Sequence, residues 1–148
     1  MSEYPTLNTQ VIGQAESALG AILNPVLAPT GTTPLQWFVL TVTAGSNGTA
    51  SRDQIAGRVV GARKVDPAQV QAAMAELAGA GLLELPGKGA ALQLTAEGQA
   101  RVQGIRSTLG EITARIFGGI PAGDLALAGH VLTVVTERAN AELSSLGG

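Results

Sequence analysis

The chain contains no cysteine, and both aromatic and charged side chains are scarce among its 148 residues. The lack of cysteine excludes disulfide bonds, thiolate metal ligands and a cysteine nucleophile. Aromatic residues make up 3% of the chain, so its core must be built from aliphatic side chains. Charged residues make up 14%, against about 25% in typical soluble domains. With a mean hydropathy of +0.27, the chain has more apolar surface than a monomer readily covers, which predicts an oligomer.

Long apolar runs are also missing. No segment approaches the roughly 18 uninterrupted apolar residues of a membrane span. The N-terminal sequence MSEYPTLNTQ has neither the basic region nor the apolar run of a signal peptide. These absences predict a cytoplasmic protein with no membrane partner.

Signatures of catalysis and metal binding are absent as well. The sequence has one histidine, His130, and no nucleophile–base–acid set, metal-ligand cluster or phosphate-binding glycine motif. We therefore expect no enzymatic activity, no bound metal and no cofactor.

The charge is unevenly spread, although the net charge is only −2. Between Arg52 and Arg106 there are seven basic and five acidic residues, so this segment carries +2 and the rest of the chain −4. A basic centre between acidic ends suits a lobe that binds a polyanion and is held by a neutral or acidic scaffold.

Apolar periodicity and capping motifs predict six helices. Thr33-Pro34-Leu35-Gln36 and Ser51-Arg52-Asp53-Gln54 fit capping boxes, and Asp66-Pro67 has the favoured order for a cap and a first helical residue. The predicted helices run from about Thr9 to Leu27, Thr33 to Ala44, Ser51 to the turn GARKV, Asp66 to Gly79, Thr95 to Phe117 and Ala122 to Leu143. Gly98 is predicted to be an imperfection near the start of the fifth helix.

The first and last helices have broad apolar faces. The first carries a widened stripe and is expected to be buried on more than one side. The last carries two neighbouring stripes, one through Leu132 and one through Val131, so we expect it to have two packing partners.

Two short strands are predicted between the fourth and fifth helices. They cover Leu82–Leu85 and Ala90–Leu94, with turn chemistry in Pro86-Gly87-Lys88-Gly89. The resulting fold class is mainly α with a small β-hairpin wing (α+β), in which a winged helix-turn-helix lobe joins a separate helical layer. The predicted boundaries are 8–30 for an N-terminal dimerisation helix, 33–96 for the winged lobe and 97–146 for C-terminal dimerisation helices.

This order of elements resembles the MarR family of bacterial transcription regulators. The most specific match is LQLTAEGQARV, Leu92 to Val102, which is similar to the second wing strand and following helix of that family. Three further segments match in order: LQWFVL at Leu35, Asp53-Gln54-Ile55-Ala56, and the end of the fourth helix with Leu77, Gly81 and Leu82. The resemblance implies a homodimer that binds a palindromic operator in double-stranded DNA, commonly as a repressor, and that responds to small aromatic or acidic ligands.

The sequence departs from the family pattern in two places. The segment from Ile55 to Val70 is about four residues longer than usual, and we assign the excess to the turn that contains Arg63 and Lys64. The wing is short, and Lys88 is the only charge at its tip. The arginine that family wings place in the minor groove therefore has no counterpart here.

The fourth helix, which would read DNA, offers few base-reading groups. Gln69 is the best candidate because glutamine can bond adenine bidentately, and Gln71 at the side could reach a base or a phosphate. Ala68 and Ala72 could touch thymine methyl groups. The competing interpretation is that both glutamines are ordinary solvated helix residues.

Four cations are candidates for phosphate contacts, which give affinity and salt dependence but not sequence choice. They are Arg52, Arg63, Lys64 and Lys88. The alternative is that they are solvated surface charges. The helix starts at Ser51 and Asp66 are further predicted to offer free backbone N–H groups to phosphate.

Three residues are candidates for ligand binding. Trp37 lies near the junction of the two predicted layers, Arg115 could meet an acidic ligand, and His130 could act as a sensor. The competing interpretations are a core tryptophan, a surface or interface arginine, and a packed or interface histidine.

Three functional hypotheses remain open. The first is a dimeric, ligand-responsive transcription regulator, favoured by the charge distribution. The second is a degenerate winged-helix dimer that serves as a protein-interaction module with weak or no DNA binding, favoured by the alanine-rich fourth helix and the short wing. The third is a small-molecule carrier built on the same dimer.

Overall fold

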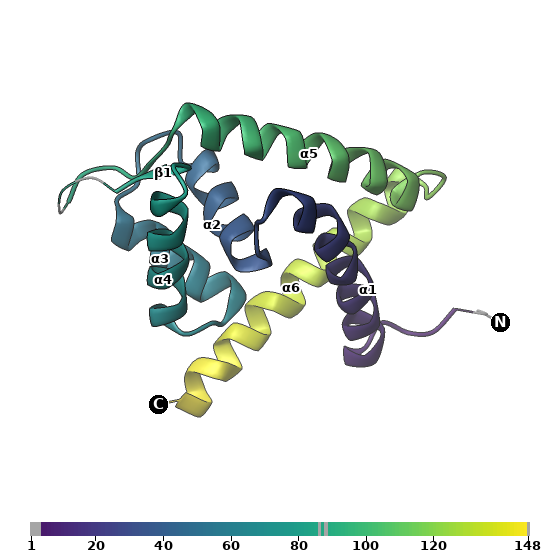
Figure 1. Ribbon diagram of the computed structural model, residues 1–148. Coiled ribbons are helices and arrows are strands. Elements are labelled where there is room, and N and C mark those ends of the chain that lie inside the picture. The colour runs from purple at the N-terminus through teal and green to yellow at the C-terminus, as the bar shows by residue number, and fades with distance from the viewer. Residues whose placement is uncertain (1–3, 86, 88, 148) are drawn as a thin grey trace. The chain divides into compact units, whose positions relative to one another are not determined.

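The computed structural model describes residues 4–85, 87 and 89–147. It is mainly helical with one two-stranded antiparallel sheet, as the sequence predicts (Figure 1). The elements are α1 (Thr9–Leu27), η1 (Ala28–Thr30), α2 (Pro34–Gly45), α3 (Arg52–Arg63), α4 (Pro67–Gly79), β1 (Leu83–Glu84), β2 (Gln93–Leu94), α5 (Ala96–Phe117) and α6 (Ala122–Gly147). The chain divides into two units, Met1–Leu109 and Gly110–Gly148.

Helices α2 and α3 begin at the two predicted capping boxes, and α4 begins at the predicted Asp66-Pro67 cap. The Thr33 hydroxyl accepts a hydrogen bond from the Gln36 backbone N–H, and the Gln36 Oε1 accepts one from the Thr33 backbone N–H. Ser51 and Gln54 repeat this arrangement at the start of α3. Each box satisfies backbone donors that the first turn of a helix leaves unpaired, so these starts are fixed by local sequence.

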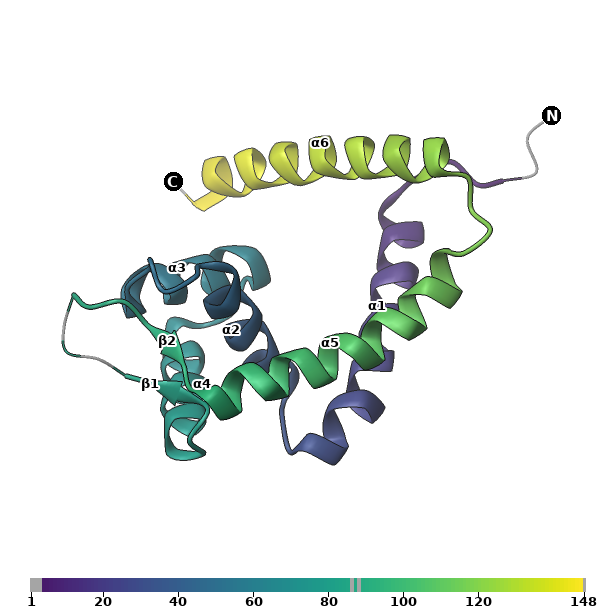
Figure 2. The same cartoon turned by 90° about the horizontal axis from the view of Figure 1, so that it is seen from above.

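The core of the first unit lies between α2, α3 and α4, with the hairpin and the start of α5 closing it (Figure 2). Helix α2 packs against α3, α4 and β2, so its apolar residues are buried on several sides. The core side chains buried completely, or nearly so, are Leu27, Val39, Leu40, Ile55, Val59, Val70, Met74, Leu77 and Leu92. They are aliphatic or methionine, as the scarcity of aromatic residues requires.

The extra residues before α4 lengthen a helix rather than the turn, which corrects the sequence interpretation. Helix α3 continues through Gly61 and Ala62 to Arg63, so the predicted turn GARKV is helical over its first three residues. Lys64 then adopts a left-handed backbone with φ of 54°, and its N–H bonds the Val60 carbonyl. This ending leaves only residues 64–66 between the two helices.

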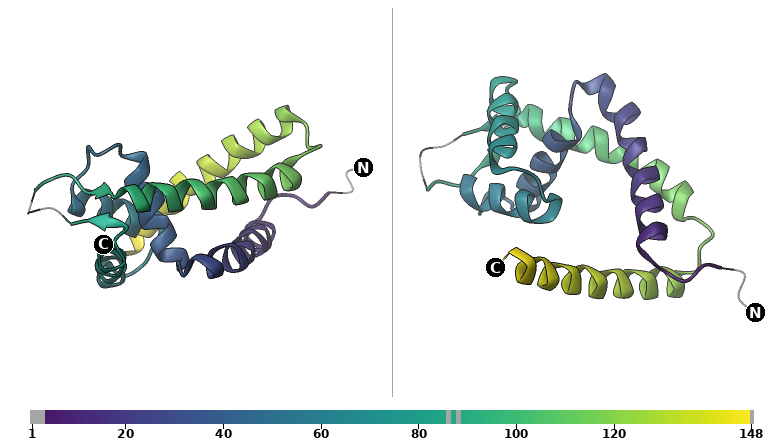
Figure 3. Two further views of the ribbon diagram at one scale, coloured as in Figure 1. Left: turned by 45° about the horizontal axis from the view of Figure 1, so that its top comes forward. Right: turned by 90° about the horizontal axis from the view of Figure 1, so that it is seen from below.

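The hairpin has shorter strands than predicted. Leu83 pairs with Leu94 and Glu84 with Gln93, and an isolated bridge joins Ser51 to Ala91. The Leu92 N–H also bonds the Ala50 carbonyl, which ties the base of the hairpin to the start of α3. The hairpin projects from the α2–α4 bundle in both views of Figure 3.

Gly98 is a requirement of the fold and not an imperfection of α5. A Cβ at this position would lie far inside van der Waals distance of the Leu82 carbonyl oxygen and 3.1 Å from the carbonyl carbon. Beside it, the Thr95 hydroxyl donates to the Gly81 carbonyl at 2.6 Å and accepts from the Gly98 N–H at 3.0 Å. The absence of a side chain therefore lets α5 start directly against the end of α4.

The broad apolar faces of α1 and α6 are left uncovered in the single chain. Leu27 is the only fully buried residue of α1, so the prediction that this helix is buried on more than one side is wrong for the chain alone. No residue of α6 is fully buried, and Leu127, Leu132 and Val135 are 64%, 38% and 40% exposed.

One helical segment among the described residues, Thr9–Thr30, is long and apolar enough to cross a membrane by length and composition. The same segment carries Glu16, which pairs with Arg63 of α3, and it ends at the buried Leu27. A charged residue is costly in the hydrocarbon region of a bilayer. These contacts fit a helix that packs on protein.

Candidate nucleic-acid interface

Helix α4 carries two alanines and a glutamine on the exposed face opposite the core. Val70, Met74 and Leu77 are buried, as the spacing predicts. Ala68, Gln69 and Ala72 are exposed together on the other face. Of the predicted DNA-binding residues, these three are therefore brought together on one surface.

Gln69 takes part in the start of its own helix. Its Oε1 accepts a hydrogen bond from the Asp66 backbone N–H at 3.4 Å, which completes a capping box with Asp66. This bond is long, and the amide NH₂ group of Gln69 makes no hydrogen bond to another described residue. The side chain is thus held at the exposed start of α4 with its donors available.

Gln71 and Arg52 bind each other. The Arg52 Nε donates to the Gln71 Oε1 at 2.9 Å, and both residues are half-buried. This bond joins the first turn of α3 to α4 and fixes the position of the guanidinium group. The remaining donors of Arg52 can still reach a phosphate beside the helix pair.

The Arg63 side chain contacts side chains of α1 and α2 and is not surrounded by solvent alone. Its guanidinium carbon lies 4.0 Å from the centre of the Phe38 ring, and its Nη2 lies 3.7 Å from the Glu16 carboxylate. Both ion-paired side chains are substantially exposed, at 40% for Arg63 and 64% for Glu16. Arg63 therefore joins three helices of the first unit, which sequence spacing alone did not indicate.

Lys64 is exposed and has the left-handed backbone that ends α3. Its ammonium group donates to the Gly61 carbonyl, which leaves two further donors. Lys88 lies outside the described residues, so its surroundings are not assigned.

The backbone donors at the starts of α3 and α4 are partly occupied. Ser51 Oγ accepts from the Gln54 N–H, and Asp66 Oδ1 accepts from the Ala68 N–H at 2.8 Å. The prediction that both helix starts offer free N–H groups is therefore only partly met. Asp66 also places a negative charge where a phosphate would approach.

The three candidate ligand residues lie in different surroundings. Trp37 is 6% exposed and belongs to the core of the first unit. Arg115, in the last turn of α5, and His130, in α6, belong to the second unit and are exposed.

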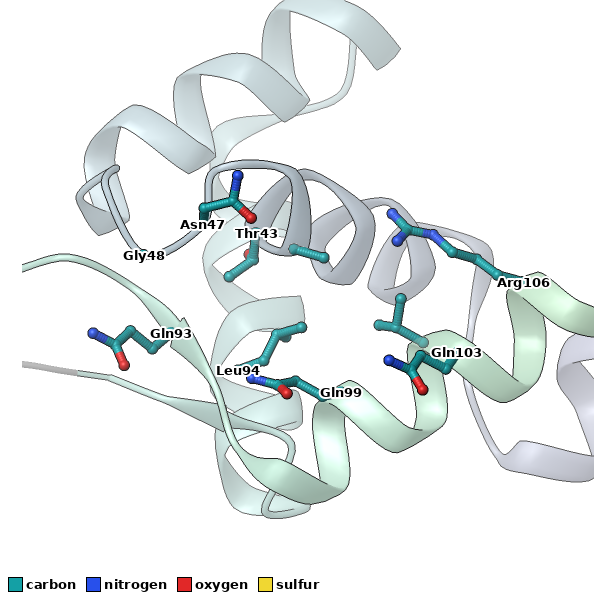
Figure 4. A pocket seen from close by; sticks show the side chains of 10 residues that line it. Thr43, Asn47, Gly48, Gln93, Leu94, Gln99, Gln103 and Arg106 are labelled. Carbon is teal, nitrogen blue, oxygen red and sulfur yellow. The ribbon is translucent and has the colours of Figure 1, made fainter.

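A set of polar residues that sequence reasoning missed lines a groove in the first unit. Figure 4 shows Asn47, Gln93, Gln99, Gln103 and Arg106 around it. One signal was available, because the last three occupy positions i, i+4 and i+7 of α5 and so share a helix face. Gln93 lies shortly before this helix in the sequence, and only Asn47 comes from a distant part of it.

Comparisons by sequence find no counterpart: neither a protein-family model nor a curated protein matches the chain.

Comparison of structures finds many similar folds. A transcriptional regulator of the MarR family from Rhodococcus sp. RHA1 has a TM-score of 0.70 at 19% identity, covering 89% of this chain and 98% of that one. NadR in complex with 4-hydroxyphenylacetate has a TM-score of 0.72 at 23% identity, covering 88% and 95%. BpsR of Bordetella bronchiseptica, whose DNA binding is regulated by 6-hydroxynicotinic acid, has a TM-score of 0.68 at 22% identity, covering 91% and 98%. The chain has the winged-helix fold of the MarR-like regulators.

Proposed function

We propose that this protein is a transcription regulator that binds a palindromic operator in double-stranded DNA as a homodimer, acts as a repressor and is released by a small ligand. The observation that carries the proposal is the exposed face of α4, where Ala68, Gln69 and Ala72 stand clear of the core. In a helix-turn-helix this face enters the major groove and contacts base edges.

Each exposed group on this face has a role consistent with DNA reading. Gln69 presents its amide donors and can bond an adenine edge, while the two alanines leave room for close approach and can contact thymine methyl groups. Arg52 and Lys64 flank the face and supply phosphate contacts. With so few base contacts, the shape and deformability of the DNA carry part of the specificity.

The homodimer is supported by the uncovered apolar faces of α1 and α6. Leu127 and Leu143 of α6 are 64% and 52% exposed, and Leu19 of α1 is 41% exposed. Surfaces of this kind are characteristic of interfaces between subunits. A two-fold dimer also presents two copies of α4, which is why the operator is expected to be a palindrome.

The ligand response is supported by what similar folds bind. One structure of NadR is a complex with 4-hydroxyphenylacetate, and the DNA binding of BpsR is regulated by 6-hydroxynicotinic acid. A ligand of that aromatic or acidic kind is therefore proposed for this chain, with Trp37, Arg115 and His130 as separate candidate contacts and no common site assigned to them.

The test is DNA binding by the purified protein. Fragmented genomic DNA of the source organism is titrated with the full chain at several salt concentrations, and the retained fragments are sequenced. We expect a palindromic sequence to be enriched and the affinity to fall steeply with salt, because phosphate contacts release counterions. Retention without enrichment would remove the reading role of Gln69, and no retention would overturn the proposal.

A second candidate function is a protein-interaction module with weak or no DNA binding. Several polar groups of the candidate interface already bind within the chain: Arg52 bonds Gln71, and Arg63 contacts Phe38 and Glu16. This candidate requires that the purified dimer retains no DNA and that no added ligand restores retention.

A further inference from the structure

A polar groove of about 480 Å³ lies in the first unit, away from the exposed face of α4. It is bounded by the C-terminal end of α2 with the following turn, by β2, and by the first turns of α5 (Figure 4). The described lining contains no residue of α3 or α4. The groove is within the size range of small-molecule sites.

Five exposed polar side chains line this groove. Asn47, Gln93, Gln99 and Gln103 each end in a carboxamide, and Arg106 ends in a guanidinium group. Among the described residues, none of these five side chains makes a hydrogen bond or ion pair with another residue. Arg106 is the one charged residue of the described lining, so the groove favours a single negative charge.

The backbone turn after α2 shapes one wall of the groove. Asn47 and Gly48 both adopt left-handed conformations, with φ of 52° and 73°. A Cβ at Gly48 would lie 3.7 Å from the Gln93 amide nitrogen and on a strained backbone. This contact distance is an ordinary one, so it is the left-handed backbone and not a lack of space that favours glycine at this position.

The floor of the groove is aliphatic. Val102 is buried and Leu94 is half-buried, while the buried Thr43 hydroxyl is already bonded to the Val39 carbonyl at 2.7 Å. None of the described lining residues is aromatic, so no ring is available to stack on an aromatic ligand.

From this lining we infer that the groove binds a small polyhydroxylated monocarboxylate, such as a sugar acid. A guanidinium group matches a carboxylate through two parallel hydrogen bonds. A carboxamide both donates and accepts, as does a hydroxyl, so four amides around one cation suit several hydroxyl groups on one anion. This groove contains none of the residues assigned above to an aromatic or acidic ligand, so the inference goes beyond the proposed function, and the binding itself needs no DNA.

The experiment is isothermal titration of the full-length protein, without DNA, using gluconate and galactonate as probes. We expect saturable binding of at least one acid with one site per chain. Glucitol, which has the hydroxyl groups but no carboxylate, and benzoate, which has the carboxylate on an aromatic ring, serve as controls and should bind at least about tenfold more weakly.

Two variants separate this site from general attraction to cations. Arg106→Gln should weaken binding of the acid by about tenfold or more, because it removes a charge-assisted hydrogen bond. Arg58→Gln removes an exposed arginine of α3 that does not line the groove and should leave binding unchanged. Gln103→Leu tests the amide contribution and should also weaken binding.

Three results of the titration would overturn the inference: no binding of either acid, acid binding by Arg106→Gln as tight as by the parent protein, or tighter binding of benzoate than of the sugar acids. A fourth result would come from a separate DNA-binding assay, if Arg106→Gln bound DNA more weakly than the parent protein with no acid present. The last result would identify the groove as a nucleic-acid contact. Because the titration contains no DNA, failure of acid binding is distinguishable from failure of the proposed operator binding.

Discussion

Arg63 and Lys64 are neighbours in the chain with different surroundings. The guanidinium group of Arg63 lies over Phe38 and beside Glu16, whereas Lys64 is exposed at the end of α3. The two residues therefore do not form one basic patch: Arg63 connects helices, and Lys64 can face DNA.

We predict different effects for the two single substitutions. Arg63→Ala should lower the free energy of unfolding by about 1 kcal/mol, because a partly exposed cation–π contact and ion pair are lost. Lys64→Ala should leave stability unchanged and reduce the salt dependence of DNA binding by about one phosphate contact. Denaturant titrations and binding at several salt concentrations measure both quantities. A loss of salt dependence in Arg63→Ala equal to that in Lys64→Ala would contradict the assignment.

Gln69 has two candidate roles that a pair of substitutions separates. Gln69→Ala should weaken operator binding by about 1–3 kcal/mol and relax the preference for adenine at one position. Asp66→Ala disrupts the same capping box from the other side and removes a negative charge, so it should leave DNA binding unchanged or tighten it. Competition assays with base-substituted operators measure the effect. Equal weakening by both substitutions would mean that Gln69 acts only through the start of the helix.

At the scale of elements, the junction between α4 and α5 depends on Gly98. We predict that Gly98→Ala lowers the free energy of unfolding by about 1–3 kcal/mol or more, because the added methyl group meets the Leu82 carbonyl. Gly104→Ala in the same helix meets nothing within 4 Å and should be neutral or stabilising by up to about 1 kcal/mol. Thermal unfolding of the two variants tests the contrast, and equal effects would show that the close approach is unimportant.

Local sequence predicted the helix starts well and the ends less well. The capping boxes at Thr33 and Ser51 are short-range arrangements within four residues, so their motifs are visible in the sequence. The end of α3 was misplaced because GARKV contains a glycine and reads as a turn, although Lys64 supplies the left-handed residue that ends the helix. The role of Gly98 depends on a backbone atom of Leu82, which no local pattern reveals.

The candidate sites show the same limit. The exposed face of α4 could be predicted, because the positions of Val70, Met74 and Leu77 fix which side is buried. The contact of Arg63 with Phe38, 25 positions earlier, could not. The groove likewise combines residues 43–48 with residues 93–106, so its existence depends on tertiary packing.

At the scale of the whole molecule, the apolar faces of α1 and α6 predict a dimer in solution. Leu132→Glu should dissociate the dimer, because it places a charge within an apolar stripe that is 38% exposed at this residue in the single chain. Thr133→Glu adds the same charge outside both apolar stripes of α6 and should leave the dimer intact. Sedimentation at several protein concentrations distinguishes the two, and a monomeric parent protein would exclude the dimer.

Trp37 is the only tryptophan in the chain and is buried in the core of the first unit. Its fluorescence therefore reports on that core alone, whereas circular dichroism also records the long helix α6 of the second unit. We predict that lowering the protein concentration, which separates subunits, moves the ellipticity transition to lower temperature before it moves the emission transition. Coincident transitions at every concentration would mean that both units unfold together. The scarcity of aromatic residues thus provides a built-in optical probe that separates melting of the lobe from loss of the subunit interface.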